Sequence, residues 1–210
     1  GLCMYRDKAG HIDVISNDKD GRFFQHRLST LDGELQARLL REFSVSSQPE
    51  GCVADDVTGR LFIGEEKYGI WTLSADGDSP ANLTPVITTG NILQADVEGM
   101  ALHHSDKGTR LVVSSQGDDS YVVLDAKPPF KVLGSFDIGL NAASGIDGVS
   151  ETDGLAVTSH SLGGPWQQGM LVVQDGRNRL PVERQNIKYV PWSVVESALN
   201  PRIPHVSGKE

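Results

Sequence analysis

The segment EGCVADD at residues 50–56 recurs twice in modified form, as EGMALHH at residues 98–104 and as DGLAV at residues 153–157. Each copy has an acid directly before a glycine and a short, mostly apolar run directly after it. GLCMY at residues 1–5 matches the same pattern without the leading acid. The four glycines are 50, 48 and 55 residues apart, which indicates internal repeats of about fifty residues.

Each repeat continues with further apolar segments that are separated by turns. Residues 60–64, 111–113 and 170–173 form the second segment, and residues 69–73 and 120–124 form the third. These segments are short, rich in β-branched and aromatic residues, and bounded by glycine and aspartate, which is typical of antiparallel strands. A repeat of roughly 40–50 residues with about four strands is typical of a β-propeller blade.

We therefore expect an all-β fold, a β-propeller, in which residues 1–210 form a single partial domain of about four blades. The blades are expected to start near residues 1, 51, 99 and 154, and each is expected to be a four-stranded antiparallel sheet. Because the first repeat begins abruptly, we expect the four blades to belong to a larger ring whose N-terminal part is missing. One helix is expected at residues 191–199, where a proline stands at an early position.

The composition argues against several classes of protein. With 38% hydrophobic residues the chain is not disordered, and with a formal net charge of −9 its surface repels nucleic acid. No apolar run approaches the ~18–20 residues that a membrane-spanning helix needs. The first residues do not resemble a signal peptide, and the sequence leaves secretion undecided.

The two cysteines, Cys3 and Cys52, are too few for a disulfide framework. Cys3 follows its repeat glycine by two residues and Cys52 by one residue, so on equivalent strands their side chains face opposite sides. We therefore expect both cysteines to be free thiols with a structural role.

An acid that recurs before the glycine of each inner strand is expected to contribute to a ring around the propeller channel. This ring would contain Glu50, Glu98 and Asp153, with Asp96 on the same face as Glu98. Further polar residues stand at the ends of second strands or shortly before the ring: Glu65 or Glu66, Gln116, Asp147 and Asp175. So many carboxylates cannot all ionise unless cations neutralise them or their pKa values rise. Their oxygen atoms favour calcium over zinc, although the acid–glycine pairs could also serve the architecture alone.

Longer motifs, in this order and at this spacing, resemble those of the β-propeller phytases, a calcium-dependent family. The motifs are QPEG at 48–51, ADD at 54–56, IGEE at 63–66, ADVEG at 95–99, SSQG at 114–117, DG at 147–148, TDG at 152–154, VVQDG at 172–176 and VPW at 190–192. The likeness covers almost all 210 residues, and it implies that the chain corresponds to the C-terminal four blades of a six-bladed ring.

The resemblance also implies an activity, the hydrolysis of phosphate monoesters of myo-inositol hexakisphosphate (phytate) with several calcium ions. It implies that the following residues bind calcium or act in catalysis: Glu50, Glu66, Asp96, Glu98, Gln116, Asp147 and Asp153. Tyr5 and Lys19 are implied to contact phosphate, and Asp175 and Asn178 to lie near a structural calcium ion. Arg177 departs from the family, which often has an acid at this position.

The mechanism expected is attack by a calcium-activated water, without a covalent enzyme intermediate. The expected substrate is phytate as its calcium complex. The resemblance further implies a monomer that is extracellular or periplasmic and has neither nucleic acid nor membrane as a partner. Two alternatives remain open: another calcium-dependent propeller hydrolase of the lactonase type, and a non-catalytic propeller that binds proteins. The several acid–glycine copies favour multiple ions, and therefore the phytase interpretation.

Overall fold

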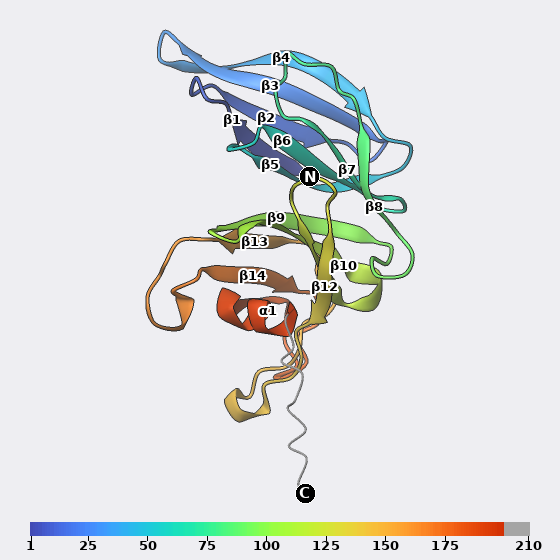
Figure 1. Ribbon diagram of the computed structural model, residues 1–210, viewed down its shortest axis with the longest axis vertical. Helices are drawn as coiled ribbons and strands as arrows, with labels where there is room; N and C mark the ends of the chain where they lie inside the picture. Colours follow the sequence, from blue (N-terminus) through green and yellow to red (C-terminus); the bar gives the residue numbers. More distant parts are fainter. Residues whose placement is uncertain (200–210) are drawn as a thin grey trace, which may run out of the picture.

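The computed structural model describes residues 1–199 and consists almost entirely of antiparallel β-sheets that follow one another along the chain (Figure 1). We call these sheets blades 1 to 4. Blade 1 contains β1 (Leu2–Arg6), β2 (Ile12–Asn17), β3 (Arg22–Leu31) and β4 (Glu34–Ser44), and blade 2 contains β5 (Pro49–Asp55), β6 (Arg60–Glu65), β7 (Gly69–Ser74) and β8 (Thr84–Thr88). Blade 3 contains β9 (Val97–Ser105), β10 (Gly108–Ser115), β11 (Ser120–Asp125) and β12 (Val132–Asp137), and blade 4 contains β13 (Leu155–Thr158), β14 (Met170–Asp175) and β15 (Asn186–Pro191).

The predicted all-β propeller blades are confirmed, with one difference. Three sheets have four strands, whereas blade 4 has three strands within the described residues. The predicted helix is also confirmed as α1 (Trp192–Leu199), which directly follows Pro191. Three short 3₁₀ helices lie in loops, at residues 116–118, 142–144 and 164–166. Residues 200–210, the last part of the predicted domain, lie outside the described residues.

The apolar runs of the middle strands are long because both faces of an inner blade are covered. In β10, Leu111 and Val113 pack into the hydrophobic cluster shared with blade 2, whereas Val112 packs into the cluster shared with blade 4. In β11, Val122 and Tyr121 divide between the two clusters in the same way. Successive side chains of a strand point to opposite faces, so a strand buried on both sides reads as a continuous apolar run.

The inner strands of neighbouring blades lie side by side, with β1 beside β5, β5 beside β9 and β9 beside β13. Two repeat glycines permit this approach. A Cβ atom at Gly51 would lie 2.5 Å from the carbonyl oxygen of Glu98, and one at Gly99 would lie 2.7 Å from that of Asp153. A side chain at either position would push the neighbouring backbone away. The glycine of one repeat therefore receives the backbone of the acid in the next repeat.

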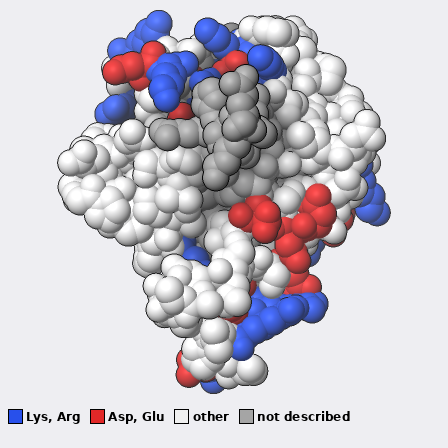
Figure 2. Space-filling view, turned by 60° about the horizontal axis from the view of Figure 1, so that its bottom comes forward, with Lys and Arg blue, Asp and Glu red and all other residues white. Residues whose placement is uncertain are grey.

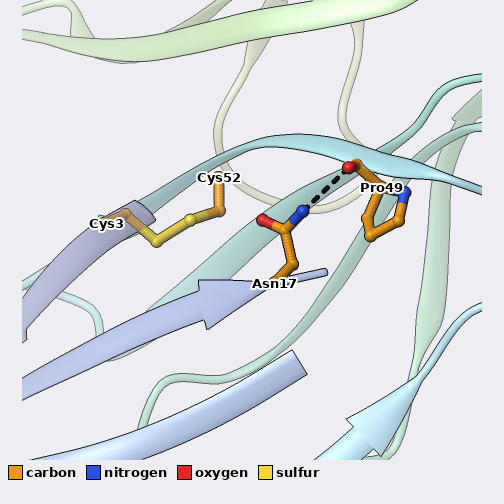
Figure 3. Close-up of a disulfide and its surroundings, with 4 residues drawn as sticks. All are labelled: Cys3, Asn17, Pro49 and Cys52. Atoms are coloured by element: carbon orange, nitrogen blue, oxygen red, sulfur yellow. Dashed lines mark hydrogen bonds between the residues drawn. A yellow bond between two sulfur atoms is a disulfide. The ribbon is translucent and has the colours of Figure 1, made fainter. Parts of the chain in front are cut away.

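The prediction of two free thiols is wrong, because Cys3 and Cys52 form a disulfide between β1 and β5, with a Cα–Cα distance of 5.7 Å (Figure 3). The two side chains do point to opposite faces of equivalent strands. Neighbouring blades stack face to back, however, so opposite faces are the ones that meet. Beside the disulfide, the side-chain amide of Asn17 donates a hydrogen bond to the carbonyl oxygen of Pro49 at 2.8 Å (Figure 3).

The surface is uneven in both charge and polarity. In Figure 2, charged side chains gather mainly in two areas, at the top and at the lower right of the face shown, and each area contains both signs. The outer faces of the first and last blades carry exposed apolar side chains, among them Leu2 and Met4 in β1 and Ile187 and Tyr189 in β15. Within residues 1–199, no helix has the length and apolar character needed to cross a membrane.

Candidate metal and active site

Three consecutive blades bring an acid to the beginning of the inner strand. Glu50 is the second residue of β5, Glu98 is the second residue of β9, and Asp153 stands two residues before β13. The amide of Gly99 donates a hydrogen bond to the carbonyl oxygen of Asp153 at 2.8 Å, and Gly51 lies against the carbonyl oxygen of Glu98. These backbone contacts fix the three acids in adjacent positions around the end of the inner strands.

The electrostatics of Glu98 show that five predicted residues share one region. Partial burial and, after it, the nearby carboxylates of Glu50, Asp153, Glu66 and Asp96, in that order, together raise the pKa of Glu98 to about 8. We call Glu50, Glu66, Asp96, Glu98 and Asp153 the central acid cluster. Such a shift indicates that no nearby positive charge offsets the burial of this carboxyl group and the negative charges around it.

Glutamine side chains contact two members of the cluster. Gln116 donates from Nε2 to Oδ1 of Asp153 at 2.6 Å. Gln48 donates to Oε1 of Glu50, and Oε1 of Gln174 accepts a hydrogen bond from the amide of Asp153 at 2.9 Å. Sequence reasoning did not assign Gln48 or Gln174 to the site. Gln48 could have been found because it stands two residues before Glu50 and therefore on the same face of the strand. Gln174 could have been found because it stands at the end of the second strand of its repeat, as Gln116 does.

A network of buried hydroxyl groups holds Thr152, the residue before Asp153, in place. The hydroxyl of Tyr121 lies 2.6 Å from Oγ1 of Thr152, which donates to the carbonyl oxygen of Gln174 at 2.8 Å. Ser114 Oγ donates to the carbonyl oxygen of Thr152 at 2.7 Å. Burial raises the pKa of Tyr121 to about 12, so this hydroxyl stays protonated. The network holds the residue next to Asp153 against blade 3.

The structure distinguishes Glu66 from its neighbour Glu65, which the sequence left as alternatives for the end of β6. Glu65 is buried, and its carboxylate accepts hydrogen bonds from the amides of Ser46 and Ser47 and from Nε1 of Trp71 at 2.7–3.1 Å. Glu65 therefore holds the strand connection in place. Glu66 is partly exposed and its charge acts on Glu98.

The two residues expected to contact phosphate lie in different surroundings. Lys19 is exposed in the turn after β2, at the end of blade 1 where Asn17 contacts Pro49. Tyr5 is buried in the hydrophobic cluster between blades 1 and 2, four residues along β1 from Gly1. Burial raises the pKa of Tyr5, and the acids that raise it further are Asp7, Asp76, Asp56 and Asp13. The structure therefore does not bring Tyr5 to the central acid cluster.

Asp147 and Asp175 form a second polar region with Lys188, and Asn178 stands next to Arg179, whose amide donates a hydrogen bond to Asp147. The ammonium group of Lys188 lies 2.7 Å from Oδ1 of Asp147 and pairs with Oδ2 of Asp175. Both aspartates are buried, as is Asn178. Calcium was predicted at Asp147, Asp175 and Asn178, but in the structure the ammonium group of Lys188 already pairs with the two aspartates.

The donor set of the central acid cluster fits a hard divalent cation. It consists of carboxylate oxygens with amide groups at its edge, the ligand type that calcium prefers. The four carboxylates that add to the effect of burial on the pKa of Glu98 are negative charges that such an ion would neutralise. The described residues include no group of three or more acidic, histidine or cysteine side chains already close enough to hold an ion, so the side chains would draw together around it.

A groove between the last two blades and the helix lies elsewhere. It has a volume of about 640 Å³ and is lined mainly by apolar side chains of β12, β15 and α1, such as Phe136, Tyr189 and Val195. It contains none of the central acid cluster. Its charged lining residues include Asp147 and Lys188, which pair with each other, so the groove is not the better candidate for the site.

Comparisons with solved structures agree with the propeller-like sheets. A chain of the Kuenenia stuttgartiensis hydrazine synthase matches with a TM-score of 0.54 and 11% identity, covering 91% of this chain and 46% of that one. The Malassezia sympodialis allergen Mala s 1 matches with a TM-score of 0.52 and 12% identity, covering 89% of this chain and 54% of that one. At such low identity these matches show the fold alone.

Comparisons of sequence are more specific. The family model described as Phytase matches residues 1–206. The 3-phytase of Bacillus subtilis (strain 168) is 33% identical over 205 residues, which cover 95% of this chain and 53% of that protein. The chain therefore spans about half the length of this curated relative. The extent of the family match and the level of identity show that the chain belongs to the phytase family.

Proposed function

We propose that the protein hydrolyses phosphate monoesters of phytate and that calcium ions held by the central acid cluster are required. Family membership and the 3-phytase relative support the reaction class. The observation that carries the calcium requirement is the convergence of acids from three blades around Glu98, whose pKa is raised to about 8 by burial together with these acids.

An acidic site for an anionic substrate needs an explanation, because carboxylates repel phosphates. Calcium ions bound here would invert the local potential, bind phosphate oxygens and lower the pKa of a bound water. Glu50, Glu66, Asp96, Glu98 and Asp153 are proposed to hold these ions. Gln116 orients Asp153 through their hydrogen bond of 2.6 Å, and the hydroxyl network keeps the backbone of Asp153 in place.

The remaining residues have narrower roles in this proposal. Lys19 is exposed in the turn after β2, close in sequence to Asn17, whose side chain contacts Pro49 beside Glu50. It is proposed to contact a substrate phosphate. Tyr5 is left out because its side chain is buried in the core between two blades. Both cysteines form a disulfide, so neither thiol can act as a nucleophile. Water is therefore the proposed nucleophile, without a covalent intermediate.

The disulfide also bears on where the protein works. Disulfides persist mainly outside the cytoplasm, in secreted and periplasmic proteins. The bond between Cys3 and Cys52 supports the proposal of an extracellular or periplasmic enzyme. We propose a monomer, with phytate in its calcium-bound form as substrate.

The test is phosphate release from phytate by the protein in calcium and after chelation. We expect activity only in calcium, and we expect Glu98→Gln and Asp153→Asn each to lose at least about tenfold in kcat/KM because a ligand carboxylate is removed. Asp106→Asn, which alters an exposed acid in the β9–β10 turn, is the matched control and should retain full activity. Undiminished activity in chelator, or full activity in both site variants, would reject the proposal.

A further inference from the structure

We propose that the ammonium group of Lys188 replaces a divalent cation in the polar region between blades 3 and 4, so that Asp147, Asp175 and Asn178 bind no calcium. This inference concerns how the blade junction is held together and does not rest on the proposed phytate hydrolysis. The region is built from three segments, namely the loop after β12, the end of β14 and the middle of β15.

The position of the ammonium group is that of a bound ion. Nζ of Lys188 lies 2.7 Å from Oδ1 of Asp147, contacts Oδ2 of Asp175 and donates to the carbonyl oxygen of Gly148 at 3.2 Å. Two carboxylates and a backbone carbonyl are the oxygen ligands that a protein offers to calcium. Lys188 is 8% exposed and Asp175 is fully buried, so water does not compete effectively for these contacts.

Protein donors occupy the other carboxylate oxygens. Oδ1 of Asp175 accepts hydrogen bonds from the amides of Ser150 at 3.1 Å and Arg177 at 3.3 Å. Oδ2 of Asp147 accepts a hydrogen bond from the amide of Arg179. These bonds tie the loop after β12 to the end of β14, with Lys188 between them. The ammonium group thus completes a cluster whose charged oxygens are already engaged.

The charge state agrees with this arrangement. Burial lowers the pKa of Lys188, but the hydrogen bonds to Asp147 and Asp175 outweigh burial and leave it above its usual value. The hydrogen bond from Lys188 is the largest cause of the lowered pKa of Asp147. Both shifts favour the charged forms of Lys188 and Asp147. A calcium ion at the same oxygens would stand within a few ångströms of the ammonium group and would be repelled by it.

Two asparagines adjoin this cluster in the sheet or along the chain. Oδ1 of Asn178 and Oδ1 of Asn186 are buried without a hydrogen-bond partner. Asn186 is paired with Asp175 in the sheet register, and Asn178 precedes the residue whose amide contacts Asp147. The ammonium group has three protons. It donates to Asp175 and Gly148, and it forms an ion pair with Oδ1 of Asp147. An ion with more coordination positions could use the two amide oxygens as well.

Removing the lysine should therefore create a calcium site. In Lys188→Ala we expect a melting temperature lower by roughly 10 °C in chelator, because two buried carboxylates lose their partner. Calcium should restore most of this loss, and equilibrium dialysis with radioactive calcium should find one more ion per chain than in the native protein. Lys127→Ala removes an exposed lysine and is the control, with an unchanged ion count and calcium response.

A second variant tests the native site directly and does not depend on the folding of Lys188→Ala. Asp175→Asn removes one carboxylate while Lys188 remains, and we expect the calcium count to stay at the native value. A count lower by one ion in Asp175→Asn would show that calcium already binds there and would overturn the proposal. So would a Lys188→Ala protein that folds but gains neither an ion nor calcium-dependent stability. These two comparisons of calcium ions per chain do not depend on phytate hydrolysis. They can therefore fail or succeed independently of the activity tests on the central acid cluster.

Discussion

The backbone amide of Gly99 donates a hydrogen bond to the carbonyl oxygen of Asp153 at 2.8 Å, across the boundary between blades 3 and 4. The bond joins the inner strand of one blade to the residue that carries a candidate calcium ligand in the next. The position of the Asp153 carboxylate thus depends on how closely two inner strands approach. The repeated acid–glycine pair combines both functions, because the glycine receives the neighbouring backbone and the acid faces the cluster.

Gly99→Ala is expected to destabilise the protein by about 1–3 kcal/mol, as is usual when a methyl group is forced into a packed interior. Its Cβ atom would lie 2.7 Å from the carbonyl oxygen of Asp153 and 2.9 Å from the amide of Leu155. Urea unfolding measures the stability, and calcium titration should show weaker binding because Asp153 is displaced. Gly154→Ala is the matched control, since a Cβ atom there would have no neighbour within 4 Å. Equal losses in the two variants would contradict this account.

Replacing both cysteines by serine should lower the free energy of unfolding by about 4 kcal/mol if the loss reflects loop closure in the unfolded chain. Cys3 and Cys52 are 49 residues apart in sequence, so their bond restricts a long loop. Urea unfolding of the native protein with reductant should match that of the double variant. Reductant should leave the double variant unchanged, and an effect of reductant on it would mean that the disulfide is not the cause.

Glu98 should make the stability of the calcium-free protein depend on pH. Its folded pKa of about 8 lies above the ordinary value of 4.5, so folding favours the protonated form. This unfavourable contribution is absent at pH values below about 4.5, grows as the pH rises to about 8, and is constant above that. In chelator, Glu98→Gln should therefore be the more stable protein at pH 8. The two pKa values alone correspond to about 4 kcal/mol, and solvent screening of this partly exposed group reduces the expected difference to about 2 kcal/mol. At pH 5 the difference should be below about 1 kcal/mol.

The same variant should behave in the opposite way in calcium, because it lacks one ligand for the ion. Thermal unfolding of both proteins at pH 5 and pH 8, with chelator and with calcium, separates the two effects. If Glu98→Gln is less stable than the native protein in chelator at pH 8, the carboxylates do not repel one another as proposed.

Much of the fold could be predicted because the repeat leaves a local signal in each copy. The phase of the acid–glycine pair was sufficient to assemble Glu50, Glu98 and Asp153. The disulfide could not be predicted in this way, because the relation between neighbouring blades decides which faces meet. Lys188 was missed since its partners are 13 and 41 residues away in the sequence and have no common periodicity with it.

The two adjacent acids at the end of β6 should respond differently to the same substitution. Glu65→Gln leaves a buried amide in place of a carboxylate that accepts from Ser46, Ser47 and Trp71, and we expect a loss of roughly 2–3 kcal/mol in stability. Glu66→Gln alters a partly exposed side chain and should change stability little, while weakening calcium binding and phosphate release at least about tenfold. Each variant is the control for the other, since they differ by one position and carry the same change. If instead Glu65→Gln abolished calcium binding with unchanged stability and Glu66→Gln did the reverse, the roles assigned to the two carboxylates would have to be exchanged.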